Sequence, residues 1–182
     1  MKNNNWNIDA AHSGIHFSVR HMVVSKVRGR FAKYSGSIAI DDDDLTRSVV
    51  DVTIDAASLD TGVADRDTHL RSADFFDVEK FPALTFRSKQ IEKVGSMKYR
   101  VIGDLTIRDV SREVSLDVEY GGRADDPWGN ERVGFVAKTS LDRKDFGLTW
   151  NQVLETGGLI VGDRIDIDLD VEAVRNAAQS AA

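Results

Sequence analysis

The sequence predicts an all-β protein of about eight antiparallel strands. The first observation is a period of two, most regular in 165–171, where three aspartates separate four apolar residues. The second is that the connections are short and rich in turn residues, such as Gly95-Ser96 and Gly121-Gly122, because short connections join antiparallel neighbours. The third is size: 182 residues, 41% of them hydrophobic, fit a single domain, 1–182, with a substantial core.

The expected strands follow the alternation and end at turn residues. They span residues 13–22, 28–40, 47–55, 82–93, 97–108, 112–121, 131–141 and 163–173. Within the second strand the apolar parity shifts near Gly36, which predicts a bulge or bend. The last ten residues, 173–182, are small and polar and predict a frayed end or a short helix.

One region, about 61–80, is predicted to be a short helical insertion. Asp60 or Thr61 is expected to cap a helix that runs to Leu70. Ser72 is expected to cap a second helical turn, which must end before the proline that follows the insertion.

Strands with one wet and one dry face form either a sandwich or a closed barrel, and the period alone does not choose between them. Several expected strands have ten or more residues, which suits a curved sheet that wraps on itself. An eight-stranded barrel can hold one small ligand, and the insertion can close one end. Phe75 and Phe76 would then project from one turn in different directions, one onto the wall and one into the lumen. Plain core packing of both rings is the alternative.

Composition excludes several classes of protein. There are no cysteines, so disulfides and thiolate chemistry are absent. The net charge is −6 and no lysine or arginine run forms a basic patch, which argues against nucleic-acid binding. No apolar run is long enough to span a bilayer, so no stable membrane insertion is expected. The first ten residues have no apolar segment of a signal peptide, so we expect a cytoplasmic protein, or a periplasmic one if a leader has been removed.

No metal site is expected from the histidines or from the acidic run. His12 and His16 on one strand would stand about 13 Å apart, too far to share an ion. Parity places His16 on the wet face and His21 on the dry face, as a satisfied buried histidine. The run 41–44 lacks the glycine and terminal glutamate of a calcium loop and predicts a solvated hairpin tip.

His69 is the strongest candidate for catalysis, because Asp67, Arg71 and Asp74 are close to it in sequence. Our first interpretation is a hydrogen-bonded cap that holds the insertion in place. The alternative is a small hydrolase or isomerase acting on an apolar substrate, with His69 and Asp67 as acid and base. No GxSxG or HExxH motif is present, so we expect no enzyme and assign no catalytic residue. A third hypothesis is a purely structural or interaction barrel with a filled lumen.

An ordered set of motifs suggests a family. The most specific motif is RDTHLRSADFFD at 66–77, and weaker motifs flank it in order: Trp6-Asn-Ile8-Asp9, His12-Ser13, Gly29 with Phe31, Phe81-Pro82, Gly103-Asp104-Leu105-Thr106 and Phe146-Gly147. From residue 6 to about 171 the chain resembles the YceI-like family of lipocalin-like, polyisoprenoid-binding proteins.

The resemblance implies an eight-stranded antiparallel lipocalin-like barrel whose apolar channel holds a long isoprenoid or fatty chain. It implies a lipid carrier, storage or sequestering protein that forms a homodimer. It implies no cofactor, apart from a bound isoprenoid lipid or isoprenoid quinone.

Strand parity then selects the side chains expected to bind the ligand from the barrel wall. They are Phe17, Val19, Phe31, Val50, Val52, Leu84, Phe86, Tyr99, Val101, Leu116, Val118 and Phe135. Near a mouth of the channel we expect Phe75, Phe76, Leu148, Trp150 and Leu154. Any one of these residues is at least as well suited to core packing, so the prediction rests on the group.

Overall fold

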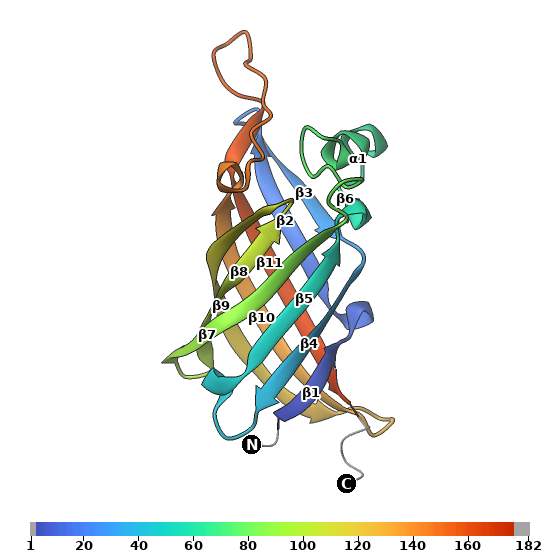
Figure 1. Cartoon of the computed structure of the whole chain (residues 1–182), viewed down its shortest axis with the longest axis vertical. Helices are drawn as coiled ribbons and strands as arrows, with labels where there is room; N and C mark the ends of the chain where they lie inside the picture. The colour runs from blue at the N-terminus through green and yellow to red at the C-terminus, as the bar shows by residue number, and fades with distance from the viewer. Residues whose placement is uncertain (1–2, 177–182) are drawn as a thin grey trace.

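The chain, described over residues 3–176 by a computed structural model, forms one antiparallel sheet that closes on itself, with one short α-helix at one end (Figure 1). The strands are β1 Asn3–Ile8, β2 Gly14–His21, β3 Ser25–Phe31, β4 Tyr34–Asp41, β5 Val49–Asp55, β6 Leu59–Asp60, β7 Ala83–Gly95, β8 Lys98–Ile107, β9 Val110–Asp125, β10 Glu131–Asp142 and β11 Val161–Arg175. The helix is α1, Ala64–Arg71. Short 3-10 turns are η1 Ala10–His12, η2 Leu45–Arg47, η3 Ala56–Ser58 and η4 Arg143–Phe146.

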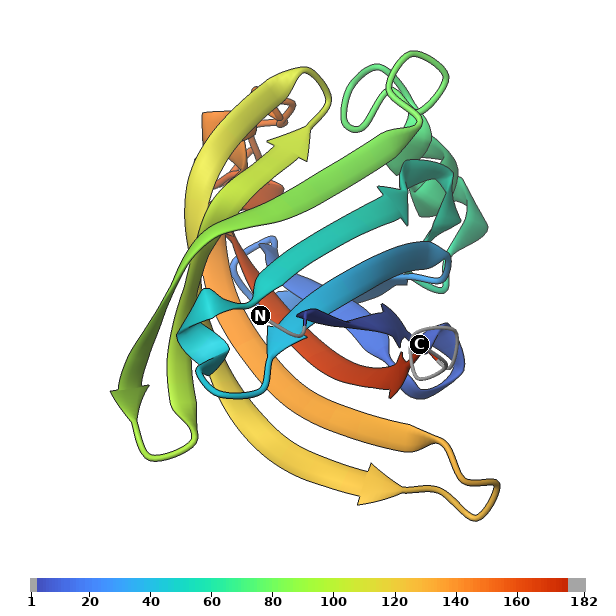
Figure 2. The same ribbon diagram turned by 60° about the horizontal axis from the view of Figure 1, so that its bottom comes forward.

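These eleven segments build a barrel of eight strands, because three of the barrel strands are interrupted; we call each barrel strand, whole or interrupted, a wall. β1 and β2 lie end to end along β11, separated by η1. β3 pairs with β2, and β4 pairs with β1, so β3 and β4 together form a second broken wall. β5 and β6 form the third, separated by η3. The expected eight-stranded antiparallel barrel is confirmed, and Figure 2 shows its strands wrapping around the axis.

The hydrogen-bonded ring closes through β1, which pairs with both β4 and β11. Toward the end that carries α1, the sheet continues as β11, β2, β3 and β6, and β6 pairs only with β3. There α1 and the turns that follow it stand where a closing strand would be (Figure 1).

The strand expected at 28–40 is wrong as a single element. The chain breaks at Ala32 and Lys33, and β4 then pairs regularly through Gly36. The change of parity therefore comes from the step between two strands, not from a bulge at Gly36. The strands β1 and β6 were not predicted, because β1 is short and rich in asparagine and β6 has only two residues. β11 continues to Arg175, so the first part of the expected tail is strand, while 177–182 lie outside the described residues.

The helical insertion forms, but its predicted caps do not. The N-cap residue of α1 is Val63, and no side chain caps the helix there. Asp67, from within the helix, instead accepts the backbone N–H of Thr61 at 2.9 Å. Phe75 and Phe76 lie in successive hydrogen-bonded turns after α1 rather than in a second helical turn.

The opposite end of the barrel is filled by Trp6, which is wholly buried. It packs with Ile38, Ile40, Val133 and Ala173. The guanidinium groups of Arg123 and Arg175 each lie 5.1 Å from the Trp6 ring.

Charged groups cross-link this Trp6 end. Arg123 and Arg175 both pair with Asp42, at 2.5 and 3.2 Å, and with Glu131, at 3.6 and 2.6 Å. Three residues of the expected solvated tip at 41–44, Asp42, Asp43 and Asp44, are exposed in the connection from β4 to β5. Asp41 differs from the prediction, because it is buried and accepts backbone N–H groups from Asp43 and Asp44.

Candidate functional site

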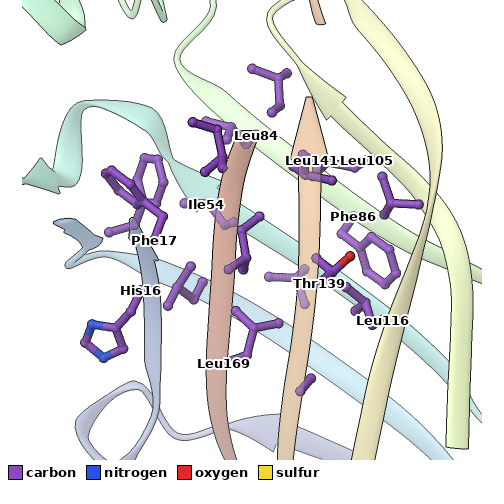
Figure 3. A pocket seen from close by; sticks show the side chains of 18 of the residues that line it. His16, Phe17, Ile54, Leu84, Phe86, Leu105, Leu116, Thr139, Leu141 and Leu169 are labelled. Atoms are coloured by element: carbon purple, nitrogen blue, oxygen red, sulfur yellow. The ribbon is translucent and has the colours of Figure 1, made fainter. Parts of the chain in front are cut away.

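The barrel encloses an apolar cavity of about 430 Å³. Side chains alternate between the two faces of the sheet, so every second side chain of a strand points into the barrel. These inward side chains are almost all aliphatic or aromatic. In Figure 3 the side chains of Leu84, Phe86, Leu116 and Leu169 converge on this space, while the His16 ring points away from it. Thr139 also faces the cavity, but its hydroxyl donates to the Ser115 carbonyl at 2.8 Å.

The cavity runs along most of the barrel. On β11 its lining extends from Val161 to Val171, a span of about 30 Å at the usual rise of a strand. Ile165, Ile167 and Leu169 point inward yet keep part of their surface exposed, because no side chain fills the space before them. The interior is therefore hollow rather than packed solid, which is the geometry that the lipid-carrier prediction requires.

Sixteen of the seventeen residues that the sequence selected line this cavity. They are Phe17, Val19, Phe31, Val50, Val52, Phe75, Phe76, Leu84, Phe86, Tyr99, Val101, Leu116, Val118, Phe135, Leu148 and Trp150. Leu154 is not among the lining residues. It lies in a small hairpin closed by the Val153–Leu159 bridge and by the bond from its own N–H to the Gly158 carbonyl, at 2.7 Å. That hairpin carries Leu154 beyond the barrel end.

Several lining residues were not selected, although the alternation already contained their signal. They include Ile15, Ile54, Leu105, Leu141, Ile165, Ile167 and Leu169. A second group of lining residues is basic, and of these strand parity had placed only His21 on the dry face. Arg20, His21, Arg66, His69 and Arg143 all line the cavity toward the α1 end.

The adjacent rings of Phe75 and Phe76 turn toward different neighbours. Phe76 packs edge-on against Phe31 of the barrel wall, with ring centroids 5.8 Å apart. Phe75 is buried between His69 and Trp150, at 5.2 and 5.4 Å. Both rings line the cavity, so together they tie the turn after α1 to the wall and to the segment that carries Trp150.

His69 joins α1 to that turn. Its Nε2 lies 2.8 Å from a carboxylate oxygen of Asp74, and its ring packs edge-on against Trp150 at 4.5 Å. Asp67 does not take part, because its buried carboxylate accepts from the backbone and hydroxyl of Thr61. The geometry matches the hydrogen-bonded cap, and the His69–Asp67 acid–base pair of the alternative hypothesis is not assembled.

Known proteins share this architecture. The family model described as the YceI-like domain matches residues 6–173. The chain belongs to the YceI-like family. Among its curated relatives, a UPF0312 protein of Vibrio parahaemolyticus is 36% identical over 167 residues, which cover 91% of this chain and 83% of the relative. A UPF0312 protein of Staphylococcus epidermidis is 37% identical over 168 residues, covering 92% and 95%.

Solved structures agree with the fold. BcnA of Burkholderia cenocepacia superposes with a TM-score of 0.80 at 25% identity, covering 91% of this chain and 98% of its own. The YCEI protein of Campylobacter jejuni superposes with a TM-score of 0.73 at 36% identity, covering 86% and 90%. A polyisoprenoid binding domain from Saccharophagus degradans has a TM-score of 0.67 at 15% identity, covering 96% and 100%, and this likeness shows the fold alone.

At the α1 end of this YceI-like barrel, Arg143 organises the segment that carries Leu148 and Trp150. Its side chain is only 3% exposed and donates to the carbonyls of Leu148 at 2.7 Å, Trp150 at 2.9 Å and Gly162 at 2.9 Å. Burial lowers the pKa of this guanidinium below its usual value, an effect that the Asp163 carboxylate opposes. Arg143 thus fixes two cavity-lining residues through backbone carbonyl groups.

Outside the cavity of the YceI-like barrel, Asp9, His12 and Glu172 approach one another closely enough to suggest a metal site. The guanidinium of Arg132 already lies among them, 2.8 Å from Asp9 and 2.5 Å from Glu172. The cluster is therefore an ion network around η1.

Within residues 3–176, no helix has both the length and the apolar character needed to cross a membrane.

Proposed function

We propose that this YceI-like barrel binds one long-chain apolar lipid, a polyisoprenoid or a similar chain, as a carrier, storage or sequestering protein. The observation that carries the proposal is the apolar cavity of about 430 Å³, which extends along most of the barrel. Its volume lies in the range of small-molecule sites, about 300–1,000 Å³. The description of the Saccharophagus degradans relative as a polyisoprenoid binding domain supports this class of ligand.

The shape and polarity of the cavity fit a tail rather than a compact polar metabolite. A hydrocarbon tail makes no hydrogen bonds, so it needs aliphatic and aromatic walls and the removal of water. Each buried CH₂ contributes about 0.8 kcal/mol relative to water. A long tail would then exceed the affinity ceiling of about 18–21 kcal/mol. The relevant exchange is therefore with a bilayer, where the tail is already dry, and the barrel needs only to match that environment.

Native mass spectrometry of the purified protein, followed by solvent extraction, tests the proposal. We expect an added mass that disappears on denaturation, and an extracted lipid with one long apolar chain. The protein should also take up a polyisoprenoid alcohol supplied in ethanol. A barrel that carries no lipid and takes up none would contradict the proposal.

The same spectra test the other predictions on assembly. The homodimer stays a prediction, and the mass of the intact assembly reports the subunit number. The cytoplasmic location also stays a prediction. The enzyme hypothesis would need turnover of an apolar substrate that is lost in His69→Ala.

A further inference from the structure

The α1 end of the barrel carries exposed apolar side chains on two neighbouring loops. The β2–β3 hairpin presents Met22, Val23 and Val24 at its tip, and Val24 is 91% exposed. The second loop presents Val153, 71% exposed, and Leu159, which face each other across a β-bridge. These five residues form what we call the rim patch. Aliphatic groups gathered in this way at one end of a barrel are typical of an interaction surface.

The rim patch adjoins the cavity. The Met22 N–H donates to the Ile160 carbonyl at 2.9 Å, and His21 pairs with Val161. His21, Ile160 and Val161 all line the cavity, so the apolar interior continues into the apolar rim. Figure 1 shows the second loop projecting beyond the barrel at the end that carries α1.

The backbone of the hairpin tip is strained in a way that turns these side chains outward. Met22 and Val23 have φ of 52° and 64°, in the left-handed region that β-branched residues rarely adopt. A glycine or asparagine would suit this loop better. The sequence places large apolar residues there instead, which points to a role for their side chains outside the fold.

Positive charge surrounds the rim patch on its hairpin side. No aspartate or glutamate occurs between Asp9 and Asp41, a stretch that contains five arginines and lysines, in a chain of net charge −6. Arg20 and Lys26 are directly opposite each other on β2 and β3, and both side chains are exposed. Two like charges in this position destabilise a strand pair. Lys26 also lies near the Asp166 carboxylate and helps to lower its pKa, whereas Arg20 forms no ion pair among the described residues.

We propose that the rim patch docks the barrel, cavity end first, on an anionic lipid bilayer. This inference rests on the proposed function, because docking would let a tail pass between bilayer and cavity without crossing water. The aliphatic tips enter the interface, and Arg20 and Lys26, about two residues behind the tip, reach the anionic headgroups. Glu155 is the single acidic residue in the second loop and is the group that must stay outside the headgroup layer.

Cosedimentation with vesicles tests the docking. The probes are phosphatidylcholine vesicles, with and without an equal amount of phosphatidylglycerol. The wild-type protein is expected to bind the anionic vesicles and to lose much of that binding in high salt. The double variant Val23→Asp/Val24→Asp should bind at least about tenfold more weakly. The matched control is Val94→Asp, because Val94 is 50% exposed at the hairpin between β7 and β8, outside the rim patch. This control should bind as the wild type does.

Three results would overturn the docking proposal. They are a wild-type protein that binds neither vesicle, a double variant that binds like the control, and a double variant that changes the subunit number, which would show that the patch is covered by a second copy. Uptake of a polyisoprenoid alcohol from ethanol separates this inference from the function. The double variant should load normally from ethanol and slowly from vesicles. Failure of all variants to load would contradict the proposed function alone.

Discussion

At the scale of single residues, Ala137 occupies a position where side-chain size controls the cavity. It lies on β10 between Val118 and Leu169, and all three line the space. Ala137→Trp should fill the lumen and lower the lipid recovered per protein at least severalfold, while overpacking costs about 1–3 kcal/mol of stability. Extraction followed by mass spectrometry measures the loss.

Its matched control is the next residue on the same strand. Val136 points outward and is 46% exposed, so Val136→Trp adds the same ring outside the barrel and should keep the lipid. Equal lipid content in the two variants would show that the ligand does not occupy this part of the interior.

Arg132 makes a prediction about acid stability. It donates to Asp9, Asp126 and Glu172, and it lowers the pKa of Asp9 from 3.8 to about 2, with help from His12. A depressed folded-state pKa contributes stability above pH 3.8 that is lost as the pH falls through about 2. Arg132→Met should lower the stability at neutral pH and flatten the loss of stability across that acid range.

Urea unfolding at several pH values measures this effect. Arg100→Met is the control, because Arg100 is exposed and lies 3.9 Å from Glu92, a pair worth well under about 1 kcal/mol. An Arg132 variant with the wild-type acid profile would contradict the assignment. No sequence pattern predicts this network, because its members are distant in the chain and meet only when β1, β10 and β11 pair.

At the scale of elements, α1 is held by a few side chains rather than by strand pairing. His69 connects it to Asp74 and Trp150, and Phe75 fills the space between them. His69→Ala should leave the barrel folded but loosen this end, so that a bound lipid transfers to vesicles severalfold faster. Thr68→Ala, an exposed change on the same helix, should transfer lipid at the wild-type rate.

Stopped-flow transfer of a fluorescent lipid measures the rate, and circular dichroism checks the fold. Unchanged transfer in His69→Ala would show that α1 does not control access. Loss of an enzymatic turnover in the same variant would instead favour the hydrolase or isomerase hypothesis.

The elements themselves were largely predictable because alternation is a local signal. Wherever a strand has one dry and one wet face, as in β7 to β11, the sequence located it. The break between β3 and β4 was misplaced, since a change of parity does not say whether a strand bulges or ends. The caps of α1 were wrong because Asp67 reaches back to Thr61 from inside the helix, which reverses the usual direction of capping.

At the scale of the whole molecule, the hollow interior required the structure. Inward residues such as Leu116 and Phe135 give the same sequence pattern in a solid core as around a cavity. The alternation therefore does not predict the volume that they enclose. The basic residues at the α1 end of the cavity were missed for a related reason. Arg66 and Arg143 come from a helix and a turn, so no strand parity marks them as inward.

The ring of backbone hydrogen bonds is complete only where β1 bridges β4 and β11. Beyond that bridge β6 pairs only with β3, and Arg71 of α1 donates to the carbonyls of Leu59 in β6 and of Ala57 just before it. On its other side β6 has no strand partner, whereas at the Trp6 end both neighbours of β1 are paired with it. We therefore expect a bulky or branched part of a ligand to be accommodated more readily at the α1 end than at the Trp6 end.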